Sequence, residues 1–269
     1  MLNKRRGAML LLTLLISTSK PPQLRNEFLD RFIVIPEHRL LFCYIEKVGC
    51  TRFNEMFYTL TDRKTKRFWY SNAPSQHNMT KSDLENLLAD NAWHKAVFYR
   101  EPLERFLSAF RSKCEDGHDR DGKGHCIRAF GQPRPTFPEA VSALMSPLNK
   151  GDAHWTPQYR FCGGLDRTLQ YYDTVQNLQK PTASSDVQRL LTAVGVPSSG
   201  LAVGLEFFPP TNKSRYIASR HQTNALNALS RYYTDDHMIR TVATFYASDY
   251  VLFGIPPPAW ALPALFGTT

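Results

Sequence analysis

Short apolar runs alternate along the chain with segments whose apolar positions recur at helical spacing. Residues 39–45 (RLLFCYI) and 95–99 (KAVFY) are nearly continuously apolar, as in strands buried on both faces. Residues 169–172, together with Val175, predict a third strand region. Because helical patterns follow these runs, the chain predicts an α/β domain with a mainly parallel sheet.

The helical segments are marked by cap residues and by apolar stripes. Thr51 is predicted to cap the helix after the first strand, and Ser82 to cap a helix over residues 83–89. Pro102 is expected in the first turn of the helix after the second strand, where its missing N–H costs nothing. Further helices are predicted over residues 137–145, 185–193, 223–232 and 235–246. Residues 117–138 are expected to be rich in loops, and no element is expected in the Pro-broken tail.

The N-terminus differs in composition from the rest of the chain. Lys4, Arg5 and Arg6 precede an apolar run over residues 7–16, which predicts a signal peptide or a signal-anchor with a short stem over residues 1–22. The run is shorter than the ~20 residues of a typical membrane-spanning helix, and a buried N-terminal helix is the alternative. A retained segment would place the body in the lumen. We expect one domain over residues 23–258 and a tail over 259–269.

Charge and cysteine content narrow the possible partners. The 269-residue chain carries a formal net charge of +9, which suits polyanions. Nucleic acid is not expected, because no Lys/Arg-rich tail or RNA-binding signature is present. The five cysteines are an odd number, and their spacing along the chain matches no zinc-binding pattern. A disulfide between Cys114 and Cys126 could close the polar loop between them, and a metal site that adds His118 and His125 is the alternative.

Two potential glycosylation triplets agree with a lumenal body. They begin at Asn78 (NMT) and at Asn212 (NKS). Each triplet is weak evidence by itself, because such triplets occur by chance.

Residues 46–52 (EKVGCTR) form a strand-to-helix turn suited to an anion. Gly49 permits a close backbone approach, and the N–H groups of Cys50, Thr51 and Arg52 stand at the start of a helix, where anions bind. Lys47 adds a mobile positive charge. An ordinary turn with a surface lysine is the alternative, and the Walker pattern is absent.

Residues 99–114 (YREPLERFLSAFRSKC) repeat this plan. Arg100 ends a strand and can bind a phosphate bidentately, and Ser108 offers a hydroxyl two turns into the next helix. A surface pair of Arg100 with Glu101 or Glu104 is the alternative. Two anion-binding turns in one domain predict a ligand with two separated phosphate-like groups.

The ordered pair of motifs resembles the Golgi carbohydrate sulfotransferases, in the group that contains the chondroitin and dermatan 4-O-sulfotransferases and the HNK-1 sulfotransferase. That family carries a motif of the form PKVACTN for the 5′-phosphosulfate and one of the form RDPFERLLSAYR for the 3′-phosphate. The similarity continues in residues 154–158 (HWTPQ) with Cys162, and in a closing pattern of Tyr232-Tyr233 and residues 246–254 (YASDYVLFG). It covers about residues 40–255, most of the chain.

The resemblance implies a three-layer, P-loop-like sulfotransferase domain with a central, mainly parallel sheet flanked by helices. It implies 3′-phosphoadenosine 5′-phosphosulfate (PAPS) as the sulfate donor and no metal. Arg100 and Ser108 would hold the 3′-phosphate. The 5′-phosphosulfate would be held by Glu46, Lys47, Val48, Gly49, Cys50, Thr51 and Arg52. Glu46 departs from the family's proline and puts a negative charge beside an anion site.

Sulfuryl transfer also needs a group that stabilises the leaving phosphate and a base for the acceptor hydroxyl. Lys47 is predicted to stabilise the leaving group. His154 is predicted to be the base, because it lies in the family-like HWTPQ stretch. A structural histidine packed beside Trp155 and a carboxylate base are the alternatives. The other histidines considered are His77, His94 and His221.

The prediction is therefore a PAPS-dependent sulfotransferase that acts on a hydroxyl of a glycan or glycoprotein. We expect a single-pass type II protein of the Golgi membrane with a lumenal catalytic domain, and secretion is the alternative. A catalytically inactive, sulfotransferase-like lumenal protein that binds acidic glycans is the alternative function, and Glu46 keeps it open. A nucleotide kinase would need a Walker loop and magnesium-binding carboxylates, which the sequence lacks.

Overall fold

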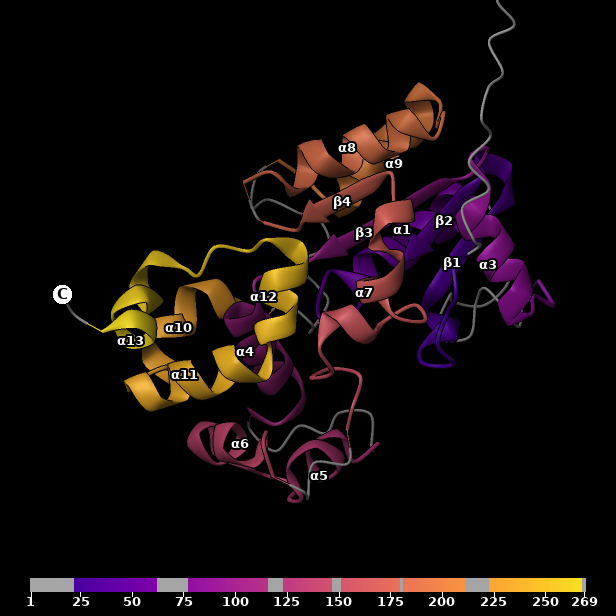
Figure 1. The fold of residues 1–269 in the computed structure, drawn as a ribbon. Helices are drawn as coiled ribbons and strands as arrows, with labels where there is room; N and C mark the ends of the chain where they lie inside the picture. Colours follow the sequence, from indigo (N-terminus) through magenta and orange to yellow (C-terminus); the bar gives the residue numbers. More distant parts are fainter. Residues whose placement is uncertain are drawn as a thin grey trace, which may run out of the picture.

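The core of the molecule is a four-stranded sheet in the order β1-β2-β3-β4 (Figure 1). β1 (Phe32–Ile35) pairs antiparallel with β2 (Leu40–Cys43), whereas β2, β3 (His94–Tyr99) and β4 (Thr174–Asn177) are parallel. The predicted α/β fold with a mainly parallel sheet is confirmed, and β1 is an antiparallel edge strand that the sequence did not predict. The computed structural model describes residues 22–61, 77–115, 123–146, 151–179, 181–210 and 223–267.

Burial explains why two strands were predicted well and the fourth was not. All four residues of β2 are buried, and so are the four central residues of β3, so both strands read as apolar runs. β4 is an edge strand whose residues are only half-buried. The apolar residues before it form η5 (Leu169–Tyr171), a 3-10 helix, so the predicted strand region is confirmed at Val175 but wrong over residues 169–172.

One group of helices packs on the sheet and shares its core. α1 follows β2, and the ring of Phe42 lies 4.7 Å from that of Phe53 and 5.0 Å from that of Phe57. α8 and α9 pack against each other beside β4 (Figure 1). The group comprises α1 (Cys50–Leu60), α3 (Lys81–Ala89), α7 (Leu165–Thr168), α8 (Ala183–Ala193) and α9 (Ser198–Phe207).

The other helices form a lobe beside the sheet with a second apolar core (Figure 1). Its rings include those of Phe106 and Phe137, whose centroids lie 5.5 Å apart. The lobe comprises α4 (Pro102–Lys113), α5 (His125–Phe130), α6 (Phe137–Ala143), α10 (Leu229–Tyr232), α11 (Asp236–Phe245) and α13 (Leu262–Phe266). α12 (Ala247–Phe253) lies between the two cores, with Phe253 buried in that of the sheet and Tyr250 packed against both. Short 3-10 helices are η1 (Leu29–Arg31), η2 (Pro36–His38), η4 (Gln158–Arg160), η7 (Ala225–Ala228) and η8 (Ala259–Ala261).

Several local predictions are corrected by the structure. Gly49, not Thr51, caps α1, and Thr80, not Ser82, caps α3 through a reciprocal capping box with Asp83. Residues 117–138 contain α5, and residues 259–267 form η8 and α13, which packs on α11. Helix α13 forms despite Pro263 because this proline stands in the first turn, where a missing N–H is tolerated. The segment over residues 223–232 divides into η7 and α10.

Two disulfides join parts of the chain. Cys114 and Cys126 are bonded, so the predicted loop closure is confirmed and the alternative metal site that used both thiols is wrong. A second disulfide, between Cys43 and Cys162, ties the end of β2 to a segment 119 residues away. Cys50 is a free thiol.

The N-terminal prediction lies outside the described residues. Within the described ranges, no helix combines the length and the apolar character that crossing a membrane requires. Asn78 is exposed, whereas Asn212 also lies outside the described residues. Membrane attachment and glycosylation therefore stay predictions.

Candidate active site

The two predicted motifs meet at the carboxyl ends of β2 and β3, the edge at which open α/β sheets bind ligands. Lys47 follows β2 and Arg100 follows β3. The Nη1 of Arg100 donates to the Lys47 carbonyl at 3.1 Å. The Arg100 backbone N–H donates to Gln158 at 2.9 Å, and Gln158 donates back to the Arg100 carbonyl at 2.9 Å. The sequence therefore placed both motifs in one site correctly.

The first turn has the backbone form of an anion site. Lys47 and Gly49 both adopt left-handed conformations, with φ of 68° and 65°. No side chain caps the N-terminus of α1, so the backbone donors of its first turn are not claimed by a cap. A Cβ at position 49 would lie 2.9 Å from the side chain of Leu178, so the site requires glycine for its space as well as its conformation.

Lys47 sits in a cationic environment. The pKa of Lys47 is lowered to about 7, mainly by burial, and the nearby charges of Lys113 and Arg100 contribute to this shift. Lys113, on α4, is only 6% exposed. The sequence analysis missed Lys113, although it falls within the second motif. Several cations around one uncapped helix start favour a bound anion, which would stabilise the charged form of Lys47.

The start of α4 in the second motif is capped by an acidic side chain. Glu101 caps α4: its carboxylate accepts from the N–H groups of Leu103 at 3.0 Å and Glu104 at 2.7 Å. The backbone donors of Leu103 and Glu104 are therefore taken, so an anion at the second motif would depend on the two side chains that the sequence predicted for it. Arg100 pairs with Glu104 at 2.5 Å, as in the alternative considered, and only the side chains of Arg100 and Ser108 remain for an anion.

Arg100 and Ser108 nevertheless retain capacity for a ligand. The Nε of Arg100 is buried and has no partner among the described residues. Ser108 is 3% exposed, and its hydroxyl lies 3.0 Å from that of Thr223. An unpaired buried arginine nitrogen and a buried hydroxyl are both groups that can donate to an incoming phosphate.

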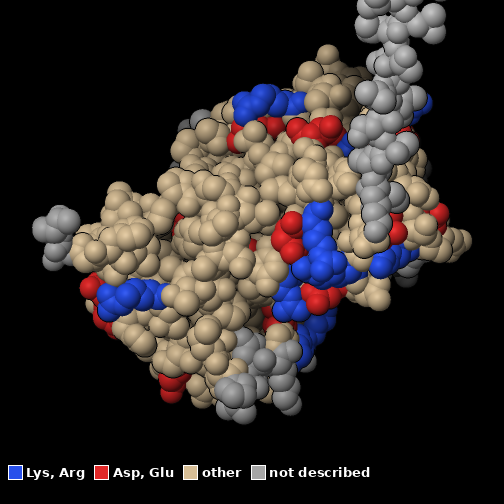
Figure 2. All heavy atoms as spheres, viewed as in Figure 1, with Lys and Arg blue, Asp and Glu red and all other residues tan. Residues whose placement is uncertain are grey.

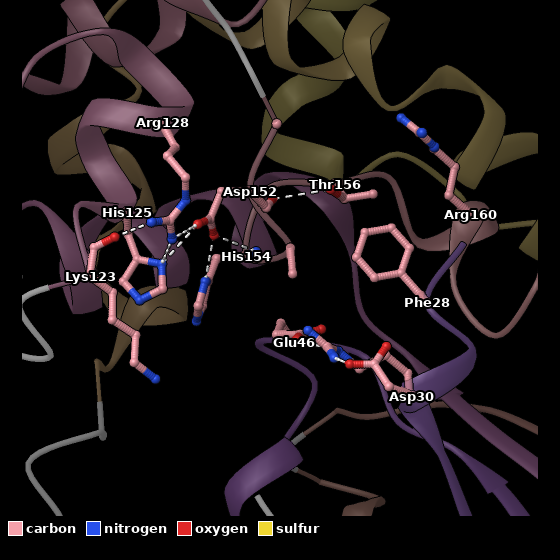
Figure 3. Close-up of a pocket in the computed structure, with 13 residues that line it drawn as sticks. Phe28, Asp30, Glu46, Lys123, His125, Arg128, Asp152, His154, Thr156 and Arg160 are labelled. Atoms are coloured by element: carbon pink, nitrogen blue, oxygen red, sulfur yellow. Dashed lines mark hydrogen bonds and ion pairs between the residues drawn. The ribbon is translucent and has the colours of Figure 1, made fainter. Parts of the chain in front are cut away.

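His154 is held by a carboxylate that the sequence analysis missed. Its Nδ1 lies 2.7 Å from Oδ1 of Asp152, and its backbone N–H donates to the same oxygen at 3.0 Å. The other oxygen, Oδ2, lies 2.8 Å from Nδ1 of His125 and 2.6 Å from Nη2 of Arg128. Figure 3 shows Asp152 between the two rings. The spacing D-A-H over residues 152–154 was the available signal.

This arrangement makes His154 a neutral base. The pKa of His154 is lowered to about 3, mainly by burial; the charges of Lys113 and Lys47 act in the same direction, and Asp152 opposes the shift. Burial alone would raise the pKa of Asp152, but its hydrogen bonds from His125 and His154 outweigh burial and hold it below its usual range. An ionised Asp152 only accepts, so Nδ1 of His154 carries the proton and Nε2 keeps its lone pair.

Of the other histidines considered, His94 lies away from this cluster. His94 begins β3, at the opposite end of the strand from Arg100, and its Nε2 lies 2.8 Å from the Thr174 hydroxyl. His77 does not line the cavity beside His154, and His221 lies outside the described residues. Trp155 packs against Phe130 at 4.7 Å, while the ring of His154 contacts that of His125 at 4.5 Å.

A cavity of about 540 Å³ lies next to His154. Asp152 and the two histidines form one wall, and Phe28 lies on the opposite side with Arg160 (Figure 3). This size suits a small organic ligand. The lining comprises Phe28, Asp30, Arg31, Glu46, Lys123, His125, Arg128, Gly151, Asp152, Ala153, His154, Thr156 and Arg160.

Many of the basic side chains near the cavity are paired. Arg128 pairs with Asp152, and Arg160 donates to Glu27 at 3.0 Å. Figure 2 shows blue side chains beside α7 with red ones among them. The surface next to the cavity is therefore a mixture of charges.

The carboxylate of Glu46, the residue before Lys47, forms an ion pair with Arg31. Its Oε1 accepts from Nε of Arg31 at 2.7 Å, and its side chain is 1% exposed. Burial raises the pKa of Glu46, and the charge of Arg31 opposes the shift. Glu46 was predicted to bind the cofactor, but the structure commits its carboxylate to Arg31 and places the residue in the cavity lining.

Arg105 joins the turn of Lys47 to the segment of His154. This fully buried arginine donates to the carbonyls of Glu46 at 2.9 Å, Thr156 at 2.9 Å and Ala153 at 3.3 Å. One rigid guanidinium thus binds three carbonyls from two segments, so the segments of Lys47 and His154 are held together.

The two other stretches that resemble the family, residues 154–158 and residues 246–254, are joined by hydrogen bonds. The N–H groups of Gln158 and Tyr159 donate to buried Asp249 at 2.8 and 2.9 Å. The hydroxyl of Tyr246 donates to the Trp155 carbonyl at 2.6 Å. The HWTPQ stretch and the closing pattern therefore form one support for the site.

The cluster of His125, Asp152 and His154 also has the side-chain types of a metal site, with ligand atoms within 4.8 Å of one another. However, Asp152 is shared by two imidazoles and a guanidinium, and the charges of Lys47 and Lys113 act on His154. These cations repel a metal ion. The donor set therefore fits an oriented histidine better than a metal site.

Comparison with known proteins decides the family. A model of the sulfotransferase family matches residues 30–256, which contain both motifs and the histidine cluster. This chain belongs to the sulfotransferase family. The match confirms the resemblance to carbohydrate sulfotransferases on which the cofactor prediction rests. No solved structure matches the chain.

Individual sulfotransferases match most of this chain. Carbohydrate sulfotransferase 14 of Danio rerio is 24% identical over 89% of this chain and 66% of its own length. Human carbohydrate sulfotransferase 9 is 26% identical over 85% of this chain and 54% of its own length. Human carbohydrate sulfotransferase 8 is 28% identical over 85% of this chain and 56% of its own length. The chain thus spans between about half and two thirds of the length of these relatives.

Proposed function

We propose that this protein transfers a sulfuryl group from PAPS to a hydroxyl of a carbohydrate. The observation that carries the proposal is the base beside the anion turn. Asp152 orients the neutral His154, and Lys47 lies close enough for its charge to lower the pKa of His154. A proton acceptor and a cation for the leaving phosphate therefore stand side by side.

The donor side is supported by two separate groups of residues. The uncapped start of α1, with Lys47, suits the 5′-phosphosulfate, and Arg100 with Ser108 suits the 3′-phosphate. When bound, PAPS would supply the sulfuryl group. Arg100 also donates to the Lys47 carbonyl, so one side chain links the two phosphate positions.

The acceptor side is supported by the cavity next to His154. An acceptor hydroxyl placed there would give its proton to Nε2 of His154 as its oxygen attacks sulfur. The bond between sulfur and the bridging oxygen breaks, and Lys47 stabilises the charge that develops on the released phosphate. Glycan and glycoprotein hydroxyls are the proposed acceptors, in line with the names of the relatives.

We also propose a single-pass type II protein of the Golgi membrane with a lumenal catalytic domain, or a secreted form if the N-terminal segment is cleaved. The basic flank before a short apolar run and the exposed Asn78 triplet support this proposal. Membrane contact would be made through the N-terminal segment.

The test is transfer of labelled sulfate from PAPS to a glycan panel. We expect Lys47→Ala and Arg100→Ala to lower transfer at least about 10²-fold while both variants stay folded. Arg189→Ala, which removes an exposed arginine of α8, is the control and should transfer normally. Folded Lys47 and Arg100 variants with wild-type transfer would contradict the assignment.

The alternative of an inactive glycan-binding protein rested on Glu46 beside the anion turn. In the structure Glu46 pairs with Arg31, which removes that argument. Calorimetry with 3′-phosphoadenosine 5′-phosphate (PAP) separates the two functions: tight binding supports the enzyme, and glycan binding without nucleotide binding supports the alternative.

A further inference from the structure

Glu46 has one carboxylate oxygen without a partner. The residue is 0% exposed, and Nε of Arg31 donates a hydrogen bond to its Oε1 at 2.7 Å. Its Oε2 is buried and has no hydrogen-bond partner in the described part of the chain. Buried polar atoms are nearly always hydrogen-bonded, so a buried exception in a residue that lines a cavity indicates a donor supplied by a ligand.

The charge around Glu46 decides which donor fits. Arg31 bonds to Asp30 as well as to Glu46, so one guanidinium serves two carboxylates. On the opposite wall, Arg128 is paired with Asp152. At this end of the cavity the carboxylates of Asp30 and Glu46 therefore share one guanidinium, and the charge of Arg105 also acts on Glu46.

A carboxylate oxygen accepts hydrogen bonds and cannot donate them. A sugar hydroxyl or amide N–H pairs with it, whereas a uronate carboxylate or sulfate ester at the same place would meet like charge without a donor. Glu46 and the base His154 line the same cavity, so the ring that contacts Glu46 is the acceptor ring or its direct neighbour (Figure 3).

We propose that Glu46 is a specificity-determining residue that selects a neutral, hydrogen-bond-donating sugar ring in the acceptor cavity and rejects an anionic one. This inference rests on the proposed function. In the motif form of the similar family the position is proline, which has no carboxylate, so the selection is a property of this chain's own residue.

The experiment compares two small acceptors that differ in charge. Transfer of labelled sulfate from PAPS is measured with p-nitrophenyl N-acetyl-β-D-galactosaminide and p-nitrophenyl β-D-glucuronide. The wild type should prefer the neutral acceptor at least about 10-fold in kcat/KM, the size expected of one buried polar contact. Glu46→Gln, which removes the charge and supplies an amide donor, should reduce this preference at least about 10-fold through the acceptor KM.

Controls separate selection from general damage. PAP affinity should change little in Glu46→Gln, whereas the thermal midpoint should fall, because the substitution removes the buried charge that pairs with Arg31. Glu206→Gln removes an exposed carboxylate of α9 and should behave as wild type. Glu46→Asp keeps the charge and should keep the rejection of the glucuronide, so the proposal remains testable if the glutamine variant does not fold.

The failure of this inference differs from the failure of the proposed function. Equal or better use of the glucuronide by wild type, or an unchanged preference in folded Glu46→Gln, overturns the role of Glu46 while transfer itself persists. If no sulfate is transferred to any glycan, the proposed function fails. Ligand-observed NMR then measures the binding of the two glycosides to the PAP-loaded protein. The ratio of the two affinities, in wild type and in Glu46→Gln, tests the selection by Glu46.

Discussion

At the scale of single residues, the site depends on side chains whose ionisation the fold has changed. Lys47 and His154 both carry pKa values below their usual ranges because burial disfavours their charged forms and neighbouring lysine charge adds to the effect. Lowered values suit both proposed roles. His154 stays a free base, and Lys47 gains charge when an anion arrives.

The pKa of Lys47 predicts how nucleotide binding depends on pH. Lys47 is charged below about pH 7 and loses its charge above it, whereas a bound phosphate favours the charged form. PAP binding should therefore take up a proton above pH 7, and its affinity should fall between pH 7 and 9. Calorimetry in buffers of different ionisation enthalpy measures both the proton uptake and the affinity.

Lys47→Met provides the comparison for this prediction. The variant should bind PAP more weakly at pH 7, and its affinity should change less between pH 7 and 9. Equal pH dependence of wild type and variant would show that another group takes up the proton.

At the scale of elements, helix starts and short connecting segments carry the chemistry. The start of α1 is uncapped, whereas the start of α4 is closed by its own Glu101. The sequence shows two similar strand-to-helix turns, and only the hydrogen bonds of Glu101 distinguish them. The segment over residues 152–158 links Asp152 and His154 to the carbonyls that Arg105 holds.

Asp152→Asn should impair the base without affecting the donor site. The asparagine amide can donate to Nδ1 of His154, which moves the proton to Nε2 and removes the free lone pair. We expect kcat to fall at least about 10²-fold with an unchanged PAP affinity. Wild-type kcat/KM should show no acid limb from His154 between pH 5 and 8, because its pKa is about 3.

Asp166→Asn is the matched control for this variant. This substitution removes a carboxylate that pairs with Arg25, at a distance of 2.7 Å, and that does not line the cavity. The kcat of the variant should equal that of the wild type. A folded Asp152→Asn protein with normal kcat would show that His154 is not the base.

At the scale of the whole molecule, the site forms where the sheet and the helical lobe meet. β2 and β3 supply Lys47 and Arg100, α4 supplies Ser108 and Lys113, and the loop before η4 supplies His154. The Cys43–Cys162 disulfide holds the loop that follows His154 to the end of β2. Covalent closure of a long loop stabilises mainly by restricting the unfolded chain.

Cys162→Ser should therefore lower the free energy of unfolding by about 2–5 kcal/mol, because the disulfide spans 119 residues. Urea unfolding followed by fluorescence measures the loss. Cys50→Ser changes a free thiol and should leave the unfolding free energy within about 0.5 kcal/mol of wild type. Equal loss in both variants would contradict the stabilising role of the disulfide.

The sequence by itself determined the strands that are buried on both faces, the helices with clear apolar stripes, and the family. It also determined Lys47, Arg100, Ser108 and His154 as site candidates. These features are local: strand burial leaves a continuous apolar run, and the motif residues follow strands directly in sequence.

Only the tertiary structure decided which groups act together. Asp152 orients His154, Lys113 approaches Lys47, and Glu101 closes the start of α4. The same holds for the edge strands β1 and β4, for α13, and for the pairing of Glu46 with Arg31. Each of these depends on the direction and burial of a side chain or on a partner distant in sequence, and residue spacing along the chain does not encode either one.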